Sequence, residues 1–216
     1  MEQTLAFQVA TKLGVDVLEV VREYYEVLLL RGLSRLPLGG SIVFKGGTCL
    51  RLVYGSPRFS QDLDFSLLEE IERFGEGIEK VVAPFPECEI EDIWKKRFTY
   101  LAEIKITRDY LPHPFRVKIE ISRRIEEGYE WKTALVSSPC SVYSVVMKVA
   151  TLRQLYRDKI ECLKKRGKAR DLFDLWFISQ KLGLPYEPPV RMDRKILRRD
   201  LRRYLPPEFH RVIEEL

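Results

Sequence analysis

The sequence predicts an α/β protein with a small mixed sheet and a C-terminal helical region. Apolar residues recur at helical spacing before residue 36 and after residue 142, and short strand-like runs lie between these regions. Hydrophobic residues make up 45% of the 216 residues, which is enough for a sizeable core. We expect a core with N-terminal helices over residues 1–136 and a helical region over residues 137–216.

Residues 3–36 are expected to form two helices, separated at Gly14 because glycine interrupts a helical pattern. The apolar positions of the first are Leu5, Val9 and Leu13, and those of the second are Val17, Val20, Val21, Tyr24, Tyr25, Leu28 and Leu29. A loop with Pro37 and Gly39-Gly40 then leads into the first strand.

The stretch from Ile42 to Phe65, IVFKGGTCLRLVYGSPRFSQDLDF, organises the chain. Its apolar start ends at Gly46-Gly47, a pair free to take positive φ or to let a ligand approach the backbone closely. Thr48 stands at the expected N-cap of a short helix that ends at Gly55. A helix N-terminus with free N–H groups favours anions. Nearby cations that could strengthen such a site are Lys45, Arg51 and Arg58.

After the turn, Asp62 and Asp64 alternate with Leu63 and Phe65. On a strand the two carboxylates point to one face, about 7 Å apart at the backbone. Their oxygens can converge on a pair of divalent ions, as in two-metal phosphoryl-transfer sites. Mg²⁺ suits such a site because it prefers oxygen ligands and keeps substrate phosphates in its shell.

Each piece alone has an ordinary structural explanation, since Gly-Gly is often a turn and Asp-x-Asp is often a solvated strand edge. Their combination resembles the active-site opening of the polymerase-β-like nucleotidyltransferase fold. More narrowly, KGGTCLRLVYG followed by RFSQDLDF is similar to the AbiEii/AbiGii toxin family, the nucleotidyltransferase toxins of toxin–antitoxin and abortive-infection systems. The resemblance implies a polymerase-β-like core with a C-terminal helical region, an NTP substrate, RNA such as a tRNA 3′ end as acceptor, and a cognate antitoxin.

Beyond the motif, residues 67–82 show apolar residues at roughly helical spacing, with glutamates on the outer face. Two strand-like runs follow, Phe98–Thr107 and Phe115–Ser122, and the intervening turn contains two prolines, so a hairpin is expected. Glu120 lies on the polar face of the second run and is the candidate third metal carboxylate. Glu103 holds a similar position on the first run, but the family pattern of an acid within a KIEIS-type strand favours Glu120.

Pro139 punctuates the expected boundary between the core and the helical region, and helices are expected over about residues 142–163 and 169–180. The stretch DKIECLKKRGKARDLFDL resembles the family's C-terminal Arg-Asp motif, which implies functional roles for Lys159 and Asp171. Lys148, expected three turns earlier on the same helix, is the alternative to Lys159, and Asp174 is a further candidate. From the residues alone, Asp171 would simply stabilise a helix N-terminus.

The segment RMDRKILRRDLRR, Arg191–Arg203, predicts a helix with a basic face and a buried stripe of Leu197, Leu201, Tyr204 and Leu205. This basic face is either an ordinary solvated surface or a track for an RNA backbone. The net charge of +5 permits a polyanionic partner without requiring one.

Composition excludes several other classes. The four cysteines are dispersed without a C-x-x-C pair, so neither a zinc site nor a disulfide framework is indicated, and the two histidines are expected in loops or at the surface. No stretch is apolar enough to span a bilayer and no signal peptide is recognisable, so a cytoplasmic protein without a membrane partner is expected.

Together these observations favour Mg²⁺-dependent transfer of NMP from an NTP to an acceptor hydroxyl. Asp62, Asp64 and Glu120 would bind two ions, with Glu120 also deprotonating the acceptor. The triphosphate would be held by Lys45, Gly46, Gly47, Thr48 and Arg51, helped by Lys159, while Asp171 would orient Lys159 or a base. The alternatives are a non-catalytic nucleic-acid- or partner-binding protein and a kinase-like transferase of the terminal phosphate.

Overall fold

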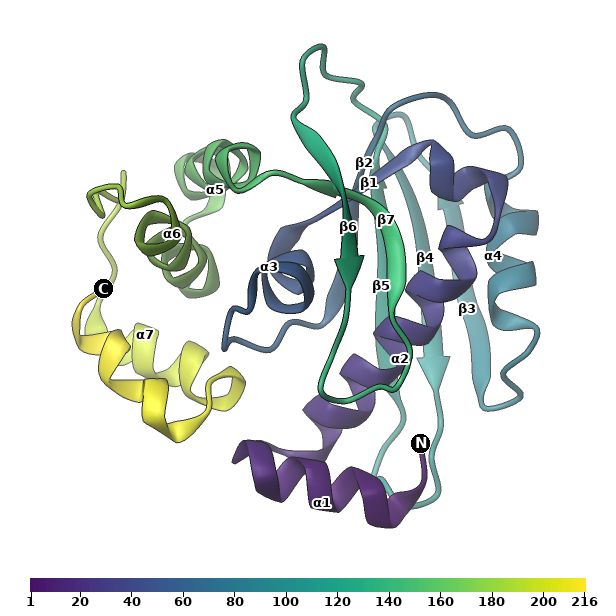
Figure 1. Ribbon diagram of the computed structural model, residues 1–216, viewed down its shortest axis with the longest axis horizontal. Coiled ribbons are helices and arrows are strands. Elements are labelled where there is room, and N and C mark those ends of the chain that lie inside the picture. Colours follow the sequence, from purple (N-terminus) through teal and green to yellow (C-terminus); the bar gives the residue numbers. More distant parts are fainter.

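One seven-stranded mixed sheet forms the centre of the protein in a computed structural model that describes residues 1–216 (Figure 1). The strand order is β3-β4-β5-β2-β1-β7-β6. Neighbouring strands are antiparallel except for the parallel pairs β1–β7 and β2–β5. The strands are β1 Ile42–Lys45, β2 Asp62–Leu67, β3 Cys88–Lys95, β4 Thr99–Ile106, β5 Phe115–Ser122, β6 Trp131–Val136 and β7 Val145–Ala150.

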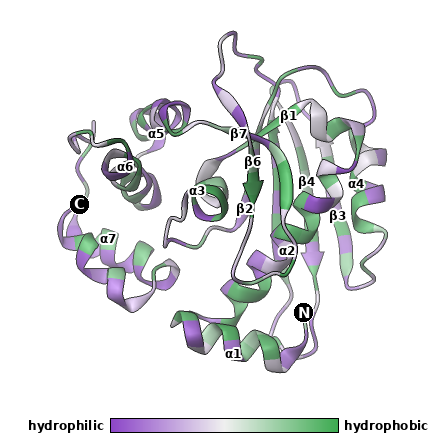
Figure 2. Cartoon of the chain, in the orientation of Figure 1, coloured by the Kyte–Doolittle hydropathy of each residue, from purple (hydrophilic) through white to green (hydrophobic).

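Helices cover both sides of this sheet. Figure 1 shows α2 and α4 on one side, and α3 with the C-terminal helices on the other. Hydrophobic residues are concentrated in the strands, while α5 and α7 carry long hydrophilic stretches (Figure 2). The helices are α1 Gln3–Leu13, α2 Val17–Ser34, α3 Gly46–Tyr54, α4 Phe74–Val82, α5 Leu152–Arg166, α6 Ala169–Leu182 and α7 Arg194–Leu201, with 3₁₀ helices η1 Pro37–Gly40, η2 Arg202–Tyr204 and η3 Pro207–Glu214.

The compact unit β1–α3–β2 follows directly from its sequence. β1 stops at Lys45, where Gly46 takes a φ of 79° that other residues rarely adopt and turns the chain into α3. Gly55 ends α3 in the left-handed conformation, and its N–H bonds to the carbonyl of Leu50. β2 can then return antiparallel to β1, with Lys45 opposite Asp64.

The larger of two buried apolar clusters extends from Ala6 in α1 to Ile213 in η3. The sheet and the C-terminal helices therefore pack around a common core. None of the helices combines the length and the apolar character that a bilayer crossing requires.

Several expectations are confirmed. Gly14 does separate α1 from α2, and β4 and β5 form the expected antiparallel pair. The predicted apolar stripe of α7 and the turn that follows this helix is buried and consists of Leu197, Leu201, Tyr204 and Leu205. The fold class, a mixed α/β core with a C-terminal helical region, is that of the structure.

The expected helix over residues 142–163 is wrong in its first part. Residues Val145–Ala150 form β7, which pairs with β1 and β6, and α5 begins only at Leu152. The apolar positions Val145, Val149 and Leu152 fit a helical period, but Val145, Met147 and Val149 are the buried set of an alternating strand. The sheet consequently continues to Ala150, past the expected division at residues 136 and 137, which falls inside the β6–β7 hairpin.

The expected helix over residues 67–82 is also too long. Its first residue closes β2, and α4 occupies only Phe74–Val82. Two strands had no prediction, β3 and β6, which are the two edges of the sheet. Because an edge strand has a neighbouring strand on one side only, many of its side chains stay exposed. Neither β3 nor β6 shows the regular alternation of buried and exposed residues that makes β5 recognisable.

The packing of α2 against α4 generates a testable prediction. A Cβ added at Gly32 would lie 2.8 Å from Val81 Cγ1, so Gly32→Ala should lower the free energy of unfolding by about 1–3 kcal/mol through overpacking. Gly75→Ala is the matched control in α4, because a Cβ added there meets nothing within 4 Å, and it should raise stability by up to about 1 kcal/mol. Urea unfolding of both variants measures the difference, and equal effects would contradict the packing described.

Candidate active site

The three candidate metal carboxylates lie on one face of two adjacent strands. β2 and β5 run parallel, and their register places Asp64 opposite Glu120 and Asp62 opposite Lys118. Glu103 is one strand further away on β4, where it forms a 3.1 Å ion pair with Lys118. Glu120, rather than Glu103, is therefore the acid next to Asp64.

Asp64 is held tightly against the Gly-Gly turn. A Cβ at Gly46 would lie 2.4 Å from Asp64 Oδ2, so only glycine fits there, on grounds of space as well as of φ. Burial raises the pKa of Asp64 to about 6, the negative charges of Asp62 and Glu120 add to this, and Lys159 opposes it. The folded chain thus disfavours the charged Asp64 carboxylate in the absence of a cation.

The next two motif residues face the protein interior. A Cβ at Gly47 would lie 2.3 Å from the Arg58 guanidinium and 2.8 Å from Ser60 Oγ. Thr48 was expected to be the N-cap of α3, but the N-cap is Lys45, and Thr48 is buried within the first turn of the helix. The Thr48 hydroxyl donates to the Asp62 carbonyl at 2.6 Å. This bond ties α3 to the start of β2.

A cavity of about 190 Å³ opens in front of Asp64 and Glu120. Three cations line it, namely Lys45 from β1, Lys159 from α5 and Arg166 at the end of α5. An adjoining larger hollow of about 700 Å³ shares Lys45, Glu120 and Arg166 and extends along α5 and the segment after β5. The predicted residues Lys45, Gly46, Asp64, Glu120 and Lys159 all line the smaller cavity.

Lys159 is anchored between two carboxylates of α6. Its Nζ lies 2.8 Å from Asp171 Oδ1 and 2.7 Å from Asp174 Oδ2, and all three side chains are buried. Arg166 also bonds to Asp171, at 3.1 Å. The structure thus pairs the predicted residues Lys159 and Asp171, and of the two only Lys159 lines the cavity.

Asp174 connects this pair to the first motif through Arg58. The Arg58 guanidinium binds Asp174 with two hydrogen bonds of 2.8 and 2.9 Å, and it also donates to the carbonyl of Phe59. Burial alone would raise the pKa of Asp174, but Arg58 and Lys159 outweigh it and lower this pKa to about 2. We call the four side chains Arg58, Lys159, Asp171 and Asp174 the buried ion network.

Two predicted cations lie elsewhere. Arg51 bonds to Glu23 of α2 at 2.6 Å and to the carbonyls of Ser56 and Pro57, and it does not line either cavity. Lys148 belongs to β7, not to the helix of Lys159, and its ammonium donates to the Gly40 carbonyl at 2.6 Å.

Sequence reasoning missed the part that Arg166 plays and treated Arg58 only as an added charge. The signal for Arg166 was its place in the basic KKRGK stretch just before the Arg-Asp motif, which was expected to be a loop but forms the end of α5. For Arg58 no local signal existed, because its partner Asp174 is 116 residues away.

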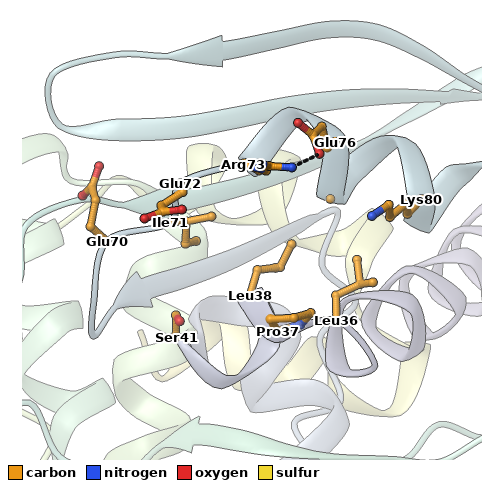
Figure 3. Close-up of a pocket in the computed structure, with 11 residues that line it drawn as sticks. Leu36, Pro37, Leu38, Ser41, Glu70, Ile71, Glu72, Arg73, Glu76 and Lys80 are labelled. Carbon is orange, nitrogen blue, oxygen red and sulfur yellow. Dashed lines mark hydrogen bonds and ion pairs between the residues drawn. The ribbon is translucent and has the colours of Figure 1, made fainter.

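The donor chemistry of the carboxylates suits Mg²⁺, but no group of three or more acidic, cysteine or histidine side chains is arranged to hold a metal ion. Another hollow, of about 350 Å³, lies between η1 and α4 and contains none of the predicted site residues. Figure 3 shows its lining, including the Arg73–Glu76 ion pair.

Comparisons with known proteins show the family of the chain. The sequence profile of the family described as "Nucleotidyl transferase AbiEii toxin, Type IV TA system" matches residues 27–215. The crystal structure of JHP933 from Helicobacter pylori is similar with a TM-score of 0.56 and 24% identity, covering 77% of this chain and 68% of that one. A candidate nucleotidyltransferase from H. pylori is similar with a TM-score of 0.51 and 26% identity, covering 71% and 64%. A comparison with curated proteins finds no match.

The buried ion network predicts a large cost for Asp174→Asn. The change leaves Arg58 and Lys159 buried without full compensation, which should lower the free energy of unfolding by about 3–5 kcal/mol at pH 7. Because the pKa of Asp174 in the folded state is depressed to about 2, its protonation removes only about 2–3 kcal/mol of this advantage as the pH falls from about 4 to below about 2, so the difference between the two proteins should narrow there. Asp200→Asn, at an exposed pair with Arg199, is the control and should leave stability unchanged in urea titrations.

Asp64→Asn should have the opposite effect. The neutral amide removes a carboxylate whose charged form is disfavoured by burial and by Asp62, so the free energy of unfolding at pH 7.5 in EDTA should rise by up to about 3 kcal/mol. Thermal and urea unfolding measure this change. A destabilised Asp64→Asn protein would contradict the electrostatics described here.

Proposed function

Because the chain belongs to the AbiEii family of nucleotidyl transferase toxins of type IV toxin–antitoxin systems, we propose that it transfers a nucleoside monophosphate from an NTP to a hydroxyl group of an acceptor RNA. A tRNA 3′ end is the first acceptor to test. The observation that carries this proposal is the register of Asp64 with Glu120, beside the Gly46 turn, at a cavity bordered by three cations.

Asp62, Asp64 and Glu120 would supply carboxylate oxygens to Mg²⁺ in this proposal. Because the three side chains do not converge on one point by themselves, the substrate phosphates would supply the remaining ligands. When bound, two such ions would stabilise charge on the attacking and leaving oxygens. The raised pKa of Asp64 supports a cation here, because buried, mutually repelling carboxylates gain most from a positive partner.

In the reaction, the acceptor hydroxyl oxygen forms a bond to the α-phosphorus, and the bond between that phosphorus and the bridging oxygen of pyrophosphate breaks. Glu120 takes the hydroxyl proton, and pyrophosphate leaves with the electron pair of the broken bond. Glu120 suits this role because it is an exposed acid beside Asp64 that lines both cavities. Catalysis is then mainly positioning and electrostatic stabilisation.

The triphosphate would meet Lys45, Lys159 and Arg166, the cations of the cavity, and the backbone at Gly46. Lys45 has no carboxylate within ion-pair distance and its ammonium lies 5.8 Å from the centre of the Tyr129 ring, so it can approach a phosphate as a point charge. Gly47, Thr48 and Asp171 support the site by fixing the positions of Arg58, Asp62 and Lys159. Arg51 would act only through its contacts with α2 and the Pro57 turn.

Membership of a toxin–antitoxin family implies a cognate antitoxin. We place the reaction in the cytoplasm, where NTPs and tRNA occur together.

An assay with labelled nucleotide tests the proposal. The purified protein is incubated with total cellular RNA, Mg²⁺ and each α-³²P-labelled NTP in turn, and label should enter RNA. Asp64→Asn should reduce the rate at least about a hundredfold, since it removes the central carboxylate while leaving the fold more stable. Asp109→Asn, in the β4–β5 connection, is the matched control and should retain wild-type activity.

Two results would redirect the proposal. Label transferred from γ-³²P-NTP but not from α-³²P-NTP would indicate a kinase-like transfer of the terminal phosphate. If NTP with Mg²⁺ fails to raise the melting temperature of the wild type, the non-catalytic alternative takes its place.

A further inference from the structure

The turn between β3 and β4 exposes two large aromatic side chains. Trp94 is 39% exposed and Phe98 is 47% exposed, although both lie close in sequence to the well-packed Tyr100. The residues between them, Lys95, Lys96 and Arg97, are also exposed. Neither aromatic ring contributes to the core of the protein, so packing does not explain this composition.

Cations lie over both rings. The ammonium of Lys96 is 4.6 Å from the centre of the Trp94 ring, and the guanidinium groups of Arg97 and Arg124 are 4.9 and 5.0 Å from that of Phe98. Lys96, Arg97 and Arg124 form no ion pair with any carboxylate of the chain. We call Trp94, Lys96, Arg97, Phe98 and Arg124 the aromatic–basic patch. It carries three positive charges without a carboxylate partner beside two partly exposed rings.

The backbone of the patch is fixed. Arg123 donates its N–H to the Phe98 carbonyl at 2.9 Å, and its guanidinium donates to the Lys96 carbonyl at 2.6 Å. Thr99 pairs with Ser122, so the turn is joined to the end of β5. A surface held in place before binding loses little conformational entropy when a ligand arrives.

β5 also connects the patch to the catalytic carboxylates. Arg124 lines the same hollow as Glu120 and Ser122, and four residues of extended chain from Glu120 to Arg124 span about 13 Å. Acidic residues such as Glu126 and Glu127 line this hollow too, so a polyanion is attracted at the patch rather than across the whole opening.

We propose that the aromatic–basic patch binds the single-stranded end of the acceptor RNA and presents its terminal hydroxyl to Glu120 and Asp64. Bases stack on Trp94 and Phe98, and phosphates bind Lys96, Arg97 and Arg124. Unpaired bases are required because duplex bases cannot reach an aromatic side chain. The inference rests on the proposed function for the fate of the hydroxyl, whereas RNA binding at the patch is independent of it.

The test measures binding of single-stranded RNA, with the Asp64→Asn protein as background so that no transfer occurs. Fluorescence anisotropy with labelled oligo(U) and oligo(A) of about 12 nucleotides should show that Phe98→Ala and Trp94→Ala each weaken binding roughly tenfold. Arg97→Gln with Arg124→Gln should reduce the slope of log affinity against log salt by about 1.4. A hairpin duplex of the same length should bind more weakly than either oligomer.

Phe7→Ala and Lys12→Gln on α1 are the matched controls, because Phe7 is 45% exposed and Lys12 is an exposed cation far from β5 in the sequence. They should bind RNA as the background protein does. Ultraviolet crosslinking of oligo(U) to the protein with an unsubstituted patch provides a second test. Mass spectrometry of the peptides should find the crosslinks within Trp94–Phe98. This experiment still tests the proposal if a patch variant fails to fold.

The outcomes separate the two proposals. If the patch variants bind RNA like the controls, or if crosslinks lie elsewhere, the patch inference is overturned while labelled-nucleotide transfer still stands or falls by its own assay. If the patch variants lose binding but the wild type transfers no nucleotide, the patch is an RNA-binding surface and the proposed function fails. If the α1 control variants lose as much RNA affinity as the patch variants, the patch inference is also overturned, because RNA binding is then not specific to the patch.

Discussion

The buried ion network is the constraint on which the rest of the site depends. Its four charged side chains come from the turn after α3, from α5 and from α6, and each carboxylate has two cationic partners. Burying so many charges is unfavourable unless every one is compensated. The network therefore admits only a narrow range of positions for α5 and α6 relative to the Gly-Gly turn, and this sets the walls of the cavity.

The network also changes the explanation of the Gly-Gly motif. From sequence, the two glycines were interpreted as a turn that lets a ligand approach the backbone. In the structure Gly46 is required by its positive φ and by the closeness of Asp64, and Gly47 by the closeness of Arg58. Both glycines thus make room for charged side chains of the protein itself, and any contact with phosphate is a second use of the same space.

Features that depend on residues close together in the sequence could be predicted, and features that depend on residues far apart in the sequence could not. The unit β1–α3–β2 could be predicted because its turns and alternation are local, and Glu120 because it lies within a clean alternating strand. β7 was mistaken for helix because Val145 and Val149, four residues apart, fit a helical period as well as the alternation of a strand, and its parallel partner β1 is about a hundred residues earlier. The pairing of Arg58 with Asp174 could not be predicted, since nothing in the local sequence distinguishes these two buried residues from charged residues at the surface.

The sequence separation within the network has a consequence for synthesis of the protein. Arg58 leaves the ribosome long before Asp174, so a nascent chain that has already formed β1–α3–β2 still lacks the partner of its buried guanidinium. Until α6 emerges, Arg58 and Lys159 lack their partners Asp174 and Asp171, and the cavity has no fixed wall opposite Asp64. The candidate site is therefore completed only after α6 has been made, late in the synthesis of the chain.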